Sequence, residues 1–191
     1  MLELALHVLD IAENSSRAHA TLIEITISED LVRDIFSLEI RDNGDGMDGQ
    51  TLERAMDPFF TTKKVRRFGL GLPMLSQAAN ATGGRFSIES EVGKGTVVYA
   101  EFRHSHIDRQ PLGDIAGSLV ALIVGNPDID ILYTHRRNGR DYVLDTREIR
   151  EGLGEVPLNH REVIGIIRDN IREGIRELHG AEPGTRSAPP E

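Results

Sequence analysis

The chain begins with a helical pattern and continues with two strand patterns. The apolar residues with helical spacing at the start are Leu2, Ala5, Leu6, Leu9 and Ala12. Residues 20–28 and 35–43 instead alternate apolar and polar side chains, as half-buried strands do. We therefore expect an amphipathic helix followed by two strands.

Further helices and strands follow, separated by glycine and proline. A short helix is expected near residues 51–56, and another over 73–82, where Pro73 stands in the first turn and Gly83 and Gly84 end the helix. Two strands then form a hairpin. After His104 the pattern restarts with three elements, namely a helix over 114–124, a hairpin over 130–145 and a long helix over 160–178.

This restart divides the chain into unequal parts. We expect a domain over residues 1–103 and a small α-β-β-α unit (helix, hairpin, helix) over 104–179, which packs on the first domain or forms an oligomer such as a homodimer. Residues 180–191 have the composition of a disordered tail. The expected fold class is α+β, with a two-layer α/β sandwich as the main domain.

Composition excludes several classes of protein. With 39% hydrophobic residues among 191, the chain can bury a substantial core. Its 31 acidic and 22 basic residues give a net charge of -9, which disfavours a nucleic-acid or anionic-membrane binder. There is no cysteine for disulfides or thiolate metal sites. The longest apolar run is too short to span a bilayer and the start lacks the basic residues of a signal peptide, so we expect a cytoplasmic protein.

The first helix carries a stripe of polar residues on one face, at Glu3, His7, Asp10, Asn14 and Arg17. Such a stripe is usually the solvated face of a helix. This one combines a carboxylate, a carboxamide and a guanidinium, which together could orient a hydroxyl group, hold Mg²⁺ and bind a phosphate. We expect His7 to pair with Glu3 or Asp10 rather than to accept a phosphoryl group.

Two glycine-rich segments add candidate chemistry. The stretch RDNGDGMD, residues 41–48, has the residues of a tight hairpin turn. The stretch GLGL, residues 69–72, precedes an expected helix, whose free N–H groups favour an anion. Just before it lie the basic residues Lys63, Lys64, Arg66 and Arg67, either as a solvated loop or as ligands of a polyphosphate.

In sequence order, LDIAENSSRAHAT, RDNGDGM, DPFFTTK, GLGL and GKGT resemble the motifs of the GHKL family. This ATP-binding domain, the Bergerat fold, is shared by DNA gyrase, the ninety-kilodalton heat-shock chaperones, histidine kinases and the MutL mismatch-repair proteins. The resemblance covers residues 1–103 and implies ATP and Mg²⁺ as cofactors. It implies that Asp42 accepts a hydrogen bond from the adenine amino group, that Gly44 and Gly46 leave room for the base, and that Thr96 joins Asp42 through water.

The resemblance also assigns the phosphate side of the site. Asn14 would bind Mg²⁺ and Arg17 would reach a phosphate. Asp10 occupies the place of a catalytic glutamate and is one methylene shorter. The remaining phosphate contacts would come from the lid, with Lys63 and Arg67, and from the GLGL segment, residues Gly69, Leu70, Gly71 and Leu72.

Three functions are compatible with these residues. The first is a kinase that transfers the γ-phosphoryl group of ATP to an unidentified partner protein. The second is a regulatory module whose partner binding is gated by nucleotide, and the third is a slow ATPase switch. Because Asn14 lies so near the start, we do not expect the dimerisation helices of a conventional histidine kinase. We expect the scattered His104, His106, His135 and His160 to be surface residues.

Overall fold

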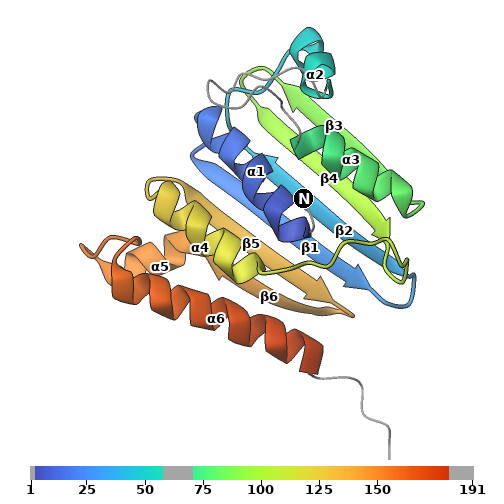
Figure 1. Ribbon diagram of the computed structural model, residues 1–191. Helices are drawn as coiled ribbons and strands as arrows, with labels where there is room; N and C mark the ends of the chain where they lie inside the picture. The colour runs from blue at the N-terminus through green and yellow to red at the C-terminus, as the bar shows by residue number, and fades with distance from the viewer. Residues whose placement is uncertain (1–2, 58–70, 181–191) are drawn as a thin grey trace, which may run out of the picture.

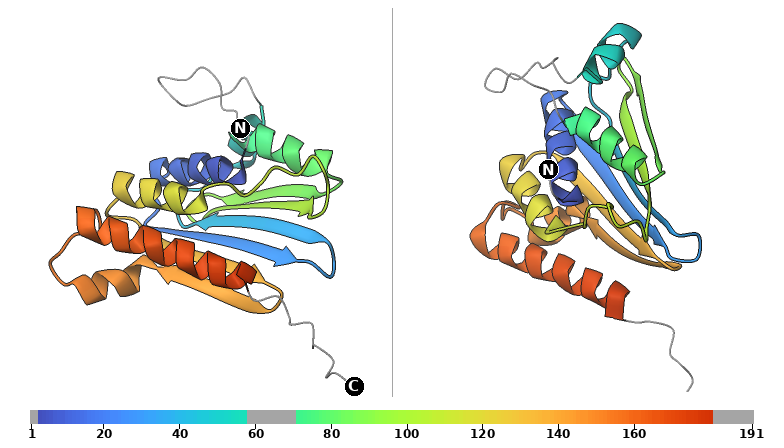
Figure 2. Two further views of the ribbon diagram at one scale, coloured as in Figure 1. Left: turned by 60° about the horizontal axis from the view of Figure 1, so that its bottom comes forward. Right: turned by 45° about the vertical axis from the view of Figure 1, so that its right-hand side comes forward.

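The computed structural model describes residues 3–57 and 71–180, which form one six-stranded sheet with helices packed on one of its faces (Figure 1). The strand order across the sheet is β3-β4-β2-β1-β5-β6. Seen from the sides, α1, α3, α4 and α6 lie in a layer over the same face (Figure 2). This arrangement confirms the expected two-layer α/β sandwich.

The helices and strands follow the expected order, with one addition. The elements of the first part are α1 Leu4–Arg17, β1 Leu22–Asp30, β2 Ile35–Asp42, α2 Gly49–Ala55, α3 Gly71–Ala81, β3 Arg85–Glu91 and β4 Gly95–Arg103. Those of the second part are α4 Ile115–Gly125, β5 Asp130–Arg137, β6 Arg140–Asp145, α5 Thr146–Leu153 and α6 Arg161–Gly180. The sequence pattern did not predict α5, which begins where the Asp145 side chain accepts a hydrogen bond from the Arg147 N–H.

The sheet crosses the domain boundary that we expected at residue 103. Strand β5 pairs in parallel with β1, and β6 pairs with β5 in an antiparallel hairpin around Asn138 and Gly139. Both turn residues have positive φ, 49° and 79°, as a tight hairpin turn requires. The second part therefore extends the sheet of the first, while its independence as a folding unit stays a prediction.

The core lies between the sheet and the helix layer. Strand β1 turns Ile23, Ile25 and Ile27 toward the helices, and each of these side chains is fully buried. Helix α1 contributes Leu4 and Val8 from its inner face. This burial of alternate strand residues is the reason for the period of two in the sequence.

The glycine-rich stretch at residues 41–48 is not a hairpin turn. Asp42 ends β2, and the chain then runs through a loop into α2, where the Asp48 side chain accepts a hydrogen bond from Thr51 N–H at 2.8 Å. Both edges of β2 are paired, with β1 and with the later strand β4, so the segment directly after β2 does not return as a hairpin strand. The loop is left free to border a pocket.

Candidate functional site

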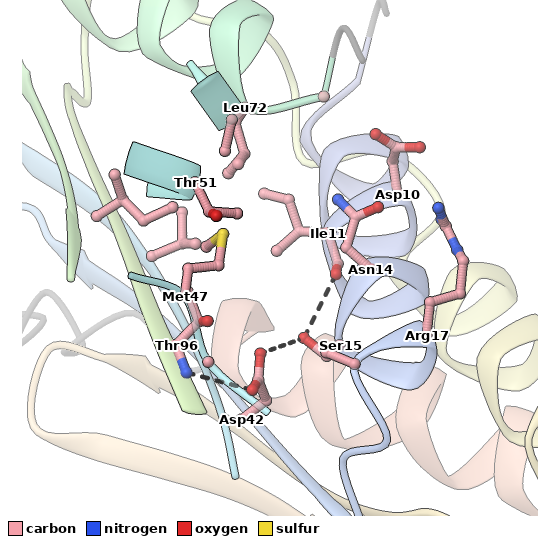
Figure 3. A pocket seen from close by; sticks show the side chains of 16 residues that line it. Asp10, Ile11, Asn14, Ser15, Arg17, Asp42, Met47, Thr51, Leu72 and Thr96 are labelled. Carbon is pink, nitrogen blue, oxygen red and sulfur yellow. Dashed lines mark hydrogen bonds between the residues drawn. The ribbon is translucent and has the colours of Figure 1, made fainter. Parts of the chain in front are cut away.

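A pocket of about 290 Å³ lies between the C-terminal half of α1, the loop after β2 and the first turn of α3 (Figure 3). Its lining includes eight of the residues that the sequence singled out, namely Asp10, Asn14, Arg17, Asp42, Gly46, Gly71, Leu72 and Thr96. The fold thus brings together residues from both ends of the first part. Lys63, Arg67, Gly69 and Leu70 lie outside the described residues.

The Asp42 carboxylate is the buried polar group of the pocket, with 8% of the residue exposed. Its Oδ1 accepts hydrogen bonds from Gly44 N–H at 2.9 Å and Thr96 N–H at 3.2 Å, and its Oδ2 accepts one from Ser15 Oγ at 2.6 Å. A carboxylate has about four acceptor positions. The three bonds fix its orientation and leave one position for a donor that enters the pocket.

Ser15 is a site residue that the sequence reasoning missed. It is buried on α1, and its hydroxyl also lies 3.4 Å from the Ile11 carbonyl oxygen. The sequence did contain a signal for a buried role of Ser15, because this residue continues the inward-facing series of Leu4, Val8 and Ile11. A polar residue at a core-facing position of a helix needs a buried partner, and here that partner is Asp42.

The rest of the pocket is lined mainly by apolar side chains. Ile11 and Met47 lie on either side of the space next to Asp42, and Leu72 approaches from the start of α3 (Figure 3). Ile88 and Val98, from β3 and β4, complete the lining. A flat, weakly polar group with one hydrogen-bond donor at its edge, such as a nucleobase with an amino group, fits this combination.

The polar stripe of α1 follows the outer side of the same pocket. Asp10, Asn14 and Arg17 project from successive turns of α1 (Figure 3). Arg17 is exposed and lies 3.6 Å from Glu13, one turn earlier on α1. A carboxylate, a carboxamide and a guanidinium therefore form a row that leads away from the buried Asp42.

The first turn of α3 meets this row. The Asp10 carboxylate lies against Gly71, and a Cβ atom at this position would force the Asp10 side chain to move. A carboxylate next to the N-terminal turn of a helix is electrostatically favourable. This contact ties the position of Asp10 to the end of the GLGL segment.

The structure gives Gly44 and Gly46 a packing role, while the expectation that they leave room for a base stays a prediction. A Cβ atom at Gly44 would meet the Ala18 carbonyl oxygen, and one at Gly46 would meet the carbonyl oxygen of Glu91. Gly46 also has a φ of 66°, which favours glycine. Both glycines are thus required by packing of the protein on itself, and only Gly46 of the two lines the pocket.

Thr96 meets Asp42 through its backbone N–H, while its hydroxyl lies 2.9 Å from Ser90 Oγ. Ser90 also accepts the Met47 N–H at 2.8 Å and donates to the Gly95 carbonyl at 3.0 Å. This network joins the β3-β4 hairpin to the loop after β2. A water-mediated contact from Thr96 to a base stays a prediction.

The hydrogen bond of His7 goes to Gln110, while Asp10, one of the two expected partners, acts on the ring through its charge. His7 is fully buried, and its Nε2 lies 3.1 Å from Gln110 Oε1, in the segment between β4 and α4. Burial lowers the pKa of His7, and the Gln110 hydrogen bond and the Gly71 backbone only partly oppose this. His7 therefore connects α1 to the second part of the chain and does not belong to the solvated stripe.

In the described part of the site, a metal ion would have fewer than three acidic or histidine ligands from the protein. Within residues 3–57 and 71–180, no three histidine or acidic side chains are grouped so that they could hold a metal ion. Mg²⁺ commonly binds through one or two protein groups, with phosphates and waters as its other ligands. The lone carboxamide of Asn14, beside a pocket for a nucleobase, fits Mg²⁺ bound in this way.

The pocket, with a buried aspartate at one end and polar side chains along its outer side, has the features of a nucleotide-binding site. The chain belongs to the family of histidine kinase-, DNA gyrase B- and HSP90-like ATPases, whose model matches residues 2–106. This match confirms the GHKL resemblance. It also implies that the domain binds ATP.

Relatives and solved structures agree with this assignment. The sensor kinase CckA of Brucella abortus is 45% identical over 64 residues, which are 33% of this chain and 7% of that protein. Sporulation kinase C of Bacillus subtilis is 36% identical over 73 residues, 38% of this chain and 17% of that protein. The chain thus spans less than a fifth of either relative's length.

The fold is also found in a crystal structure described as the N-terminal domain of a DNA repair protein. The TM-score is 0.54 at 17% identity, covering 76% of this chain and 53% of that one. This likeness concerns the fold alone.

Among the helices of the described ranges, none combines the length and the apolar character that crossing a bilayer requires.

Proposed function

We propose that this chain binds Mg²⁺ and ATP and transfers the γ-phosphoryl group to a hydroxyl or imidazole group of a partner protein. The observation that carries the proposal is the row of Asp10, Asn14 and Arg17 beside a pocket whose buried end holds Asp42. With the adenine amino group bound to Asp42, the phosphates of ATP extend toward this row. The kinase names of two relatives support the same class of reaction.

Each residue of the row has a distinct task in this proposal. Asn14 supplies an oxygen to Mg²⁺, and Arg17 neutralises charge on a phosphate. Asp10 accepts the proton of the attacking group, which forms a bond to the γ-phosphorus while the bond from this phosphorus to the bridging oxygen breaks and ADP leaves. Catalysis comes mainly from positioning and charge neutralisation, as in other phosphoryl transfers.

The partner is a protein rather than a nucleic acid or a membrane. The net charge of -9 repels the phosphates of nucleic acids and of anionic lipids. We place the reaction in the cytoplasm, where ATP is available.

Label transfer from γ-³²P ATP tests the proposal. The purified chain is incubated with Mg²⁺, first alone and then with lysate of its host, and compared with the variants Asn14→Ala and Asp10→Asn. We expect a labelled partner band that both variants lose, while Asp10→Asn keeps its affinity for ATP in calorimetry. Asn80→Ala, an exposed asparagine of α3, serves as the matched control. Tight ATP binding without any labelled band would contradict the kinase function.

A second function is supported by the contact between Asp10 and Gly71. This contact links the nucleotide site to the first turn of α3, so that bound nucleotide could set the position of α3 and thereby open or cover a docking surface. No phosphoryl transfer is needed for such gating. Under this alternative, ATP changes partner binding as measured by pull-down, and Asp10→Asn leaves partner capture intact.

A further inference from the structure

A buried polar cluster lies at the opposite end of the strands from the nucleotide pocket. Its centre is Glu29, near the end of β1, which is only 5% exposed. The C-terminal end of α6 reaches this side of the molecule, away from α2 and the pocket (Figure 1). The contacts of the Glu29 carboxylate are His135 Nε2 at 2.8 Å, His179 Nε2 at 3.2 Å, His104 Nε2 at 3.3 Å and Arg137 Nη1 at 2.6 Å.

Glu29 is ionised in this environment. Burial alone would raise the pKa of its carboxyl group, but hydrogen bonds from His135 and His104, with the charges of His135 and His179, more than offset burial and lower the pKa to about 2. Both carboxylate oxygens are therefore hydrogen-bond acceptors at neutral pH. Each histidine that bonds to them must provide an N–H.

His135 satisfies this requirement through its Nε2–H. Its Nε2 donates to Glu29 Oε1, and its Nδ1 lies 3.0 Å from the Tyr133 hydroxyl. His135 is fully buried, so the expectation of a surface residue is wrong.

His179, in the last turn of α6, has different surroundings. Its Nδ1 lies 2.8 Å from the carbonyl oxygen of Ile175, and its Nε2 lies 3.2 Å from Glu29 Oε1. Neither oxygen can donate a proton, so Nδ1 donates to the Ile175 carbonyl, while the Nε2 contact is an ion pair that forms only when both ring nitrogens are protonated. A cationic ring at this position is also favoured by the C-terminal end of the helix.

Other charged groups bear on this end of α6. Arg137 opposes a cation at His179, because it already neutralises Glu29, while the 41% exposure of the His179 side chain lowers the cost of the extra charge. The ring of His135 meets that of His179 edge-on, at 5.9 Å between centroids. Arg140 of β6 donates at 2.8 Å to the Leu178 carbonyl and thus caps the same turn without a titration near neutral pH.

From these contacts we infer that His179 is a proton-dependent latch, which fastens the last turn of α6 to Glu29 of the sheet. When the ring loses a proton, its charge is lost and the ion pair with Glu29 no longer forms, while Nδ1 keeps its hydrogen bond to Ile175. The turn then opens more often and exposes Leu178, which is 5% exposed in the closed form. The latch is a conformational device of the fold, separate from the nucleotide site and independent of the proposed kinase activity.

Two measurements on the full chain test the latch. Nitrogen-15 NMR of the ring distinguishes the doubly protonated form of His179 from either neutral tautomer, and hydrogen exchange, corrected for its intrinsic pH dependence, reports the opening of residues 176–180. The variants are His179→Gln, which has no titrating ring, and His160→Gln as the matched control, an exposed histidine before the start of α6.

We expect both ring nitrogens of His179 to be protonated at pH 5.5 and one to lose its proton by pH 8.5. Because the loss of a partly exposed ion pair weakens the closed form only modestly, protection of the last turn should fall by up to about fivefold over this range. The fall should be absent in His179→Gln and retained in His160→Gln. A neutral ring at pH 5.5, or equal protection at both pH values, would overturn the latch. Protection gained on adding Zn²⁺ would also overturn it, in favour of a metal site.

Discussion

Replacing Glu29 with glutamine should destabilise the protein strongly at neutral pH and much less in acid. The pKa of Glu29 in the folded state is about 2, against an ordinary value of 4.5. At about 1.4 kcal/mol per pKa unit, this difference corresponds to roughly 3 kcal/mol of folding free energy. For a chain of this size, a loss of that magnitude lowers the melting temperature by about 6–12 °C.

The sign of the pH dependence follows from the lowered pKa. The stabilisation by Glu29 is complete above the pKa of the unfolded state, near 4.5, and is lost as the pH falls toward 2. By pH 3 less than half of it should remain, about 1.4 kcal/mol. Urea unfolding of the wild type and Glu29→Gln at pH 7 and pH 3 measures both differences.

A control separates this effect from a general loss of surface charge. Glu39 is partly exposed on the open face of the sheet, 3.6 Å from Arg41. A surface ion pair of this kind contributes at most about 1 kcal/mol, so Glu39→Gln should change stability little. If Glu29→Gln costs the same at pH 3 as at pH 7, or less than about 1 kcal/mol at pH 7, the reasoning about the buried cluster is refuted.

Two further predictions concern the nucleotide pocket and its frame. Asp42→Ala removes the acceptor at the buried end of the pocket, and hydrogen bonds to a charged group contribute about 1.5–3 kcal/mol. ATP affinity in calorimetry should fall about tenfold or more, whereas Asp45→Ala in the exposed part of the same loop should leave it unchanged; equal affinities would remove Asp42 from the site. Gly46→Ala should destabilise the fold by more than about 1 kcal/mol in urea unfolding, since φ is 66° and the Glu91 carbonyl occupies the space. Gly49→Ala, which meets open space, is the comparison, and a similar stability of the two variants would argue against this reasoning.

The sequence predicted most of the secondary structure, because burial on one side leaves a simple period. The alternation in β1 and the inner stripe of α1 follow directly from one-sided packing. The turn at Asn138 and Gly139 was predicted for a similar local reason, since few residues adopt two successive positive φ angles. Short helices such as α5 lack enough turns for a periodic signal.

The chain by itself also determined the family and most of the pocket, because the motifs keep their order and their residue types are specific to the chemistry. Only the tertiary structure decided which polar groups meet across the sequence. Ser15 and Asp42 are 27 residues apart and Glu29 and His179 are 150 apart, and no local rule relates such positions. Parallel pairing of β5 with β1 brings the second part onto the first, and this pairing depends on the packing of two distant apolar surfaces. The Glu29 cluster exists because that packing buries a carboxylate among side chains from three other parts of the chain, namely His104 after β4, His135 and Arg137 of β5, and His179 of α6.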